Sequence, residues 1–142
     1  MHQRIIILDF GSQFTQLIAR RVREAGVYSE IYPCTLPVDK LAALQPHGII
    51  LSGSPWSVYD EGAPKLSAEI LSMTRSDGSP TPILGICYGL FAMADVTGGN
   101  VARAERREFG RAAIEVLDDS DLLHGVPTGS TVWMSHGDHL VT

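Results

Sequence analysis

The chain of 142 residues is long enough for one domain with a sizeable core, because 44% of its residues are hydrophobic and 19% are charged. It contains no run of about 18 apolar residues, which excludes a membrane-spanning helix. The formal charge of -5 at pH 7 argues against a broad nucleic-acid surface. Basic residues among acidic neighbours predict solvated charge on helices and loops; they are Arg20, Arg21, Arg23, Arg103, Arg106, Arg107 and Arg111.

The N-terminus and the cysteines indicate the compartment. Residues 1–4 lead directly into an apolar segment, without the separate apolar region and cleavage site of a secretory signal. We therefore expect a cytoplasmic location. Cys34 and Cys87 could form at most one disulfide, and a domain of this size does not depend on one, so we expect reduced thiols.

In chain order, segments with strand character alternate with segments of helical periodicity. Strands are predicted over residues 4–9, 28–32, 48–51 and 82–87. The first helix is predicted from an N-cap at Ser12 to a stop at Gly26, and its buried side would be formed by Phe14, Leu17, Ile18 and Val22. A short helical turn is predicted over residues 41–44.

Two further helices complete this alternating part. One is predicted to begin at Pro64, with a buried side formed by Leu66, Ile70, Leu71 and Met73. The other, over residues 88–96, follows the fourth strand directly. Repeated strand and helix units predict an α/β fold, in which a mostly parallel, twisted sheet carries helices on both faces. Residues 112–116 and 131–135 predict two more strands, joined by a turn-rich stretch without a helix.

The segment Gly85-Ile86-Cys87-Tyr88-Gly89 lies at a predicted junction of strand and helix. A nucleophile flanked by glycines in this position is typical of a nucleophile elbow. The positive end of the following helix would favour the Cys87 thiolate, and the N–H of Tyr88 could donate to an oxyanion. The alternative is a buried structural cysteine beside glycines that allow close packing of the helix.

Two other segments are candidates for the same site. The small-residue loop 52–55 follows the third strand, where it would either complete an oxyanion hole opposite Cys87 or form a plain turn. Residues 133–139 are polar and follow a predicted apolar strand. His136, Asp138 and His139 could bind a metal, but no further ligand completes a four-coordinate set, so contact with substrate is preferred.

Two short matches carry no function. Asp9-Phe10-Gly11 has the spelling of the magnesium-binding tripeptide of protein kinases, but no catalytic-loop pattern or glycine-rich loop accompanies it. The sequence also lacks the glycine-rich phosphate-binding motifs of P-loop and dinucleotide-binding proteins. Neither kinase activity nor nucleotide binding is predicted for this chain.

These segments together resemble the glutamine amidotransferase domain of GMP synthases, a class I amidotransferase. The resemblance covers nearly the whole chain and is carried by residues 8–24, 26–30, 48–53, 85–89, 107–110 and 133–138. It implies a flavodoxin-like α/β fold and a partial amidotransferase domain over residues 1–142, without a second domain. It also implies that a thiol attacks the side-chain amide of glutamine, forming a glutamyl thioester and releasing ammonia.

The resemblance assigns a role to each matching position. Cys87 resembles the nucleophile, Gly53 and Tyr88 resemble the backbone oxyanion donors, and Ser135, His136 and Gly137 resemble the part that holds the α-amino and α-carboxylate groups of glutamine. No metal or cofactor is expected in this chain. ATP and magnesium would belong to a synthetase domain or chain, which is the expected partner beside glutamine; nucleic acid and membrane are not expected.

The sequence departs from the family pattern in three places. Ser54 stands where a second glycine is usual, and Phe91 stands where a glutamine usually contacts the substrate. The family's catalytic His-Pro-Glu lies downstream of the segment 135–138 and is expected to be missing with the C-terminal part of the domain. The alternatives are therefore an amidotransferase-like binding or regulatory module without glutaminase activity and, third, a flavodoxin-like ligand-binding domain.

Overall fold

The computed structural model describes residues 2–142, apart from the side chains of residues 106–108. Four parallel strands form a sheet in the order β2-β1-β3-β4. They are β1 (Arg4–Asp9), β2 (Tyr28–Pro33), β3 (Gly48–Leu51) and β4 (Ile83–Gly85). The predicted α/β fold is confirmed. Because β1 pairs with β3 in parallel, the carboxyl ends of these two strands lie side by side.

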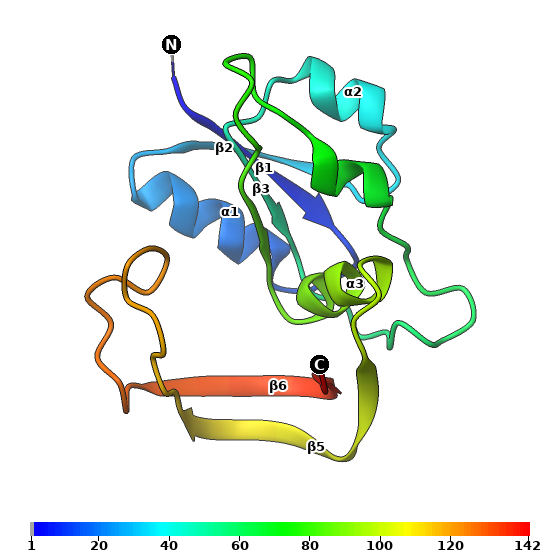
Figure 1. Ribbon diagram of the computed structural model, residues 1–142, viewed down its shortest axis with the longest axis vertical. Coiled ribbons are helices and arrows are strands. Elements are labelled where there is room, and N and C mark those ends of the chain that lie inside the picture. The colour runs from blue at the N-terminus through cyan, green and yellow to red at the C-terminus, as the bar shows by residue number, and fades with distance from the viewer. Residues whose placement is uncertain (1) are drawn as a thin grey trace.

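Helices cover both faces of this sheet (Figure 1). Helix α1 (Thr15–Glu24) packs on β1 and β2, whereas α2 (Val38–Ala43), the short 3-10 helix η1 (Ala68–Ser72) and α3 (Tyr88–Val96) enclose the larger core. The alternation of side chains along a strand explains this division. The buried residues of the core that lies on the α2 and α3 side include Ile6, Leu8, Leu41, Ile49, Leu51, Ile70, Tyr88 and Phe91.

Residues after α3 form a separate antiparallel pair, β5 (Val101–Ala113) and β6 (Thr131–Leu140), below the parallel sheet in Figure 1. The sequence predicts strands only over 112–116 and 131–135. Strand β5 begins earlier and already ends at Ala113, so residues 114–116 lie outside it, and β6 ends later than expected. The charged stretch of β5 resembles a loop in sequence, but a two-stranded ribbon with open faces tolerates charge on either side. Residues 133–139 therefore lie within β6 and do not follow it.

The helix predicted from Pro64 is wrong, because only the 3-10 turn η1 forms there. Contacts outside the segment occupy the backbone groups that a helix would need. The carbonyl of Pro64 accepts the Tyr88 hydroxyl, Ser67 is extended, and the Thr81 N–H donates to the Met73 carbonyl at 2.9 Å. Leu66, Ile70 and Met73 are nevertheless buried, as predicted.

The buried side of α1 also differs from the prediction. Phe14 and Leu17 are 51% and 45% exposed, while Thr15 and Ala19 face the sheet. The helix begins at Thr15, whose hydroxyl donates to the Asp9 carboxylate at 3.0 Å, and this bond fixes the rotation of the first turn. Ser12 does not cap the helix; its Oγ accepts the Phe14 N–H in the preceding turn.

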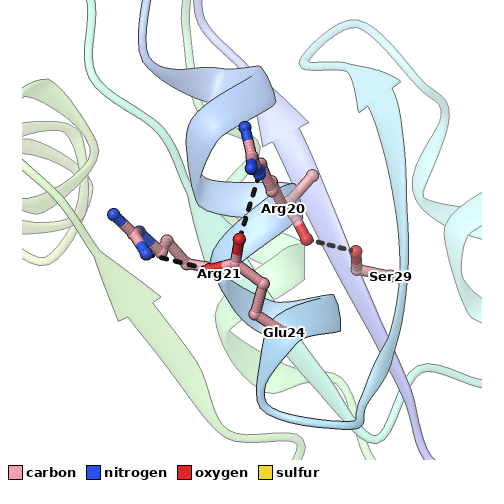
Figure 2. Close-up of polar contacts among 5 residues, drawn as sticks. Arg20, Arg21, Glu24 and Ser29 are labelled. Atoms are coloured by element: carbon pink, nitrogen blue, oxygen red, sulfur yellow. Dashed lines mark hydrogen bonds and ion pairs between the residues drawn. The ribbon is translucent and has the colours of Figure 1, made fainter.

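Most arginines of the predicted solvated clusters have polar partners. Arg20 and Arg21 both pair with Glu24, at 3.0 and 2.8 Å, on the exposed side of α1 (Figure 2). Arg103 pairs with Asp60 at 2.5 Å. The side chains of Arg106 and Arg107 lie outside the described residues. Across the part of the chain that the structure describes, no helix is both long and apolar enough to cross a membrane.

Candidate active site

Cys87 occupies the predicted elbow between β4 and α3. Its φ of 52° and ψ of -114° lie in a region that side chains rarely adopt, so the turn places the thiol at the N-terminus of the helix in a strained backbone conformation. The Cys87 carbonyl still accepts a hydrogen bond from the first turn of the helix, from the Leu90 N–H at 3.0 Å.

The two flanking glycines are required by packing. A Cβ on Gly85 would lie 2.6 Å from the Leu90 amide nitrogen, and one on Gly89 would lie 2.4 Å from the Leu51 carbonyl oxygen. Neither neighbour can move away, because both are backbone atoms. The elbow is therefore closed tightly against β3, which brings the thiol to the end of that strand.

The loop after β3 lies directly against the nucleophile. A Cβ placed on Gly53 would be 3.5 Å from the Cys87 Cβ and 3.6 Å from the Ser12 Oγ. The residues Gly53, Ser12 and Cys87 follow three different strands, β3, β1 and β4. The carboxyl ends of parallel strands thus meet at the site, as ligand sites of open α/β sheets do.

Strand β6 also contacts the elbow. The Cys87 thiol donates to the Ser135 carbonyl, with an Sγ to O distance of 3.6 Å. His136 is half-buried; its Nδ1 lies 2.7 Å from the Asp138 carbonyl oxygen, and its ring meets the buried Phe91 ring edge-on at a centroid distance of 5.9 Å. The sequence-predicted residues Gly53, Cys87 and Tyr88 are thus brought together with the segment 135–137.

The sequence considers Asp138 as a metal ligand and prefers contact with substrate for its segment; the structure adds that the Asp138 charge acts on the Cys87 thiol. Its side chain is buried, at 5% exposure, and its Oδ2 has no hydrogen-bond partner within the described residues. The negative charge of Asp138 contributes to the raised pKa values of Cys87 and Tyr88. A carboxylate inside the polar segment 133–139 was the available sequence signal.

The electrostatics of the thiol differ from the prediction. Burial raises the pKa of Cys87, and the Asp138 carboxylate raises it further, whereas a hydrogen bond from the Tyr88 N–H lowers it. Burial also raises the pKa of Tyr88 to about 12. The thiol is therefore held mainly in its protonated form at neutral pH, although the helix N-terminus was expected to favour the thiolate.

The metal alternative gains no support. Within the described residues, no three His, Cys, Asp or Glu side chains are grouped so that they could hold a metal ion. Cys34 follows β2: its N–H donates to the Asp9 carbonyl at 3.1 Å, and its pKa is raised by burial and then by Asp9.

A parallel sheet with a strained cysteine at its carboxyl edge defines an α/β fold of the nucleophile-elbow type. The glutamine amidotransferase class-I model matches residues 6–142, so the chain belongs to that family. The chain is 54% identical over 140 residues to a glutamine-hydrolyzing GMP synthase of Desulfotalea psychrophila, and 54% identical over 140 residues to one of Lactobacillus acidophilus. These matches cover 97% and 98% of this chain but 26% of each relative.

Solved structures agree with the family. A protein described as a GMP synthase subunit from Thermoplasma acidophilum has a TM-score of 0.75 and 29% identity, over 99% of this chain and 68% of that one. A glutamine amidotransferase from Thermotoga maritima shares the fold, with a TM-score of 0.68 and 19% identity over 99% of this chain and 63% of that one. The chain spans about a quarter of the length of the curated relatives named above.

Proposed function

We propose that this chain carries the glutamine-hydrolysing part of a GMP synthase, supplying ammonia for the amination of XMP. One observation carries the proposal: the strained elbow places Cys87 against the Gly53 loop, and its thiol donates to the Ser135 carbonyl. The names of relatives more than half identical to this chain support GMP synthesis as the use of the ammonia.

Cys87 would act as the nucleophile. As its sulfur attacks the side-chain amide carbon of glutamine, a C–S bond forms and the amide oxygen becomes an oxyanion. The N–H groups of Tyr88 and Gly53 are the proposed donors to that oxyanion. Loss of ammonia, which requires a proton, leaves a glutamyl thioester, and water then attacks the thioester to give glutamate and the free thiol.

The segment 135–138 would bind the other end of glutamine. The Ser135 carbonyl accepts the Cys87 thiol, and His136 and Gly137 are the next residues of β6. The buried Oδ2 of Asp138 is a charged acceptor without a partner in the described structure, and an α-ammonium group would satisfy it. The charge of that ligand would also offset the effect of Asp138 on the Cys87 thiol.

The departures from the family pattern lie in the loop after β3 and in α3. The Ser54 hydroxyl accepts the Trp56 N–H at 3.3 Å, so it belongs to its own turn. Phe91 packs against His136 and offers no amide to the substrate. We propose that glutamine recognition relies on β6 more than on α3 in this chain.

The ammonia acceptor would lie in another part of the enzyme. The relatives that share this region are about four times as long, since the match covers 26% of each. We propose that a synthetase domain or chain, which uses ATP and magnesium, is the partner, and that the combined enzyme works in the cytoplasm.

The proposal is tested with the diazoketone analogue of glutamine, which alkylates an activated thiol that binds the glutamine skeleton. We expect saturable labelling of Cys87 that glutamine suppresses. The Cys87→Ala variant should not be labelled at this position. The asparagine homologue of the reagent, one methylene shorter, is the matched control and should label slowly. Labelling that glutamine does not suppress would contradict a glutamine site, and glutamine binding in a calorimetric titration without any covalent labelling would favour the binding-module alternative.

A further inference from the structure

Ser52 follows β3 immediately, and its side chain is completely buried. Its Oγ accepts the Phe10 N–H at 3.1 Å and donates to the Gly53 carbonyl at 3.3 Å. The Ser52 N–H donates to the Leu8 carbonyl at 3.0 Å. This one residue therefore ties the loop after β3 to the end of β1.

These bonds fix the backbone on both sides of the Gly53 N–H. The peptide before Ser52 is held by Leu8, and the peptide after Gly53 is held by the Ser52 hydroxyl. Between them lies the peptide whose N–H belongs to Gly53. Glycine has the widest backbone freedom of any residue, so the N–H of an untethered Gly53 could point in several directions.

We infer that Ser52 is a positioning residue for the reaction at Cys87: its hydroxyl holds the Gly53 N–H in the direction of the developing oxyanion. The inference rests on the proposed function, because it assumes that an oxyanion forms at this place. It predicts that loss of the Ser52 hydroxyl slows a reaction in which an oxyanion forms and leaves unchanged the rate of a reaction in which none forms.

Two reactions of the Cys87 thiol allow this comparison, because one forms an oxyanion and the other does not. With the γ-(p-nitrophenyl) ester of glutamate, the thiolate adds to the γ-carbonyl carbon, the oxyanion forms, and the C–O bond breaks to release p-nitrophenolate, which needs no proton to leave. The thiol proton is taken up by the buffer. With iodoacetamide, sulfur displaces iodide from a saturated carbon, so no oxyanion forms.

The variants are Ser52→Ala and, as a matched control, Ser29→Ala. Ser29 is also completely buried, and its Oγ donates to the Ala19 carbonyl at 3.0 Å between β2 and α1 (Figure 2). Both variants lose a buried hydroxyl, and we expect both unfolding midpoints to fall by about 2 to 8 °C. Ser52→Thr keeps the hydroxyl and serves as the rescue variant.

In the 142-residue chain, at a temperature where circular dichroism shows every variant to be folded, Ser52→Ala should reduce the p-nitrophenolate burst rate about 10-fold or more. Its iodoacetamide rate should match that of the wild type, and Ser29→Ala and Ser52→Thr should keep both rates. The inference is overturned if Ser52→Ala is no slower than Ser29→Ala, if both of its rates fall together, or if Ser52→Thr is as slow as Ser52→Ala. A wild-type chain that reacts with iodoacetamide but gives no burst would instead contradict the proposed function, and with it the inference.

Discussion

Cys87 combines a reactive position with surroundings that oppose its ionisation. Burial and Asp138 raise its pKa, and only the Tyr88 N–H lowers it. An acid whose pKa is raised stays protonated over a wider range, so its thiolate fraction grows only as the pH approaches the raised value. The binding of a cation beside Asp138 would lower the pKa again. Glutamine, through its α-ammonium group, would thus promote the ionisation of its own nucleophile.

The pH dependence of alkylation tests this electrostatic account. For the free chain, the rate of Cys87 alkylation by iodoacetamide should continue to rise beyond the pH at which a small-molecule thiol is fully ionised. Asp138→Asn removes a negative charge, so its profile should shift to lower pH. Peptide mapping assigns the rate to Cys87, and a profile unchanged by Asp138→Asn would exclude the carboxylate as a cause.

Cys34 is expected to take no part in catalysis. Its thiol is half-buried and its pKa is raised, first by burial and then by Asp9, and the hydrogen bond to Ser135 belongs to the Cys87 thiol. Labelling with the diazoketone analogue of glutamine should therefore modify Cys87 in preference to Cys34. Cys34→Ala should leave the labelling rate unchanged, and preferential modification of Cys34 would contradict the assignment of the nucleophile.

Phe91→Gln tests the departure in α3. The amide could hydrogen-bond the substrate, and unpaired polar substrate groups cost about 1 to 3 kcal/mol, so the Kd for glutamine should fall. The same change removes a buried ring that packs on His136, and the free energy of unfolding should fall by about 2 to 4 kcal/mol. Calorimetric titration and chemical denaturation measure the two effects; a Kd that rises would show that the ring matters more than the amide.

At the level of elements, the elbow depends on the contact between α3 and β3. Gly89→Ala would drive a Cβ to 2.4 Å from the Leu51 carbonyl oxygen, so the helix start or the strand must shift. We expect the free energy of unfolding to fall by about 3 kcal/mol or more. Gly53→Ala is the matched control, since its Cβ would have no neighbour nearer than 3.5 Å and should change stability by less than about 1 kcal/mol. Equal losses in urea denaturation would refute the packing argument.

The elements that local sequence predicted well are those whose burial is decided by one periodic pattern. Strands β1 and β3 and helix α3 occur where the apolar residues indicated, and the glycines of the elbow indicated a tight junction. The segment after Pro64 was mistaken because its backbone groups bond to distant residues such as Tyr88 and Thr81. The burial of the Asp138 side chain could not be predicted, since it depends on how the β5-β6 pair folds back onto α3.

For the whole molecule, we predict that the 142-residue chain does not turn over glutamine at a useful rate. The thiol's hydrogen-bond partners in the described structure are the Tyr88 N–H and the Ser135 carbonyl, and neither can take a proton from sulfur and pass it to ammonia. General acid and base help typically contributes about 10²- to 10⁴-fold. Ammonia release should equal that of Cys87→Ala; sustained release that depends on Cys87 would show that a group such as His136 supplies the proton transfer.

The contact between Cys87 and Ser135 joins residues that are 48 positions apart, and this separation has a consequence for biosynthesis. During translation, the parallel strands and α3 are available as soon as residue 96 has left the ribosome, whereas β6 follows only after the long connection from β5. Contacts between distant residues form late, because the loop between them must close first. A nascent chain would therefore display the elbow with its thiol uncovered, and only the arrival of β6 would enclose it.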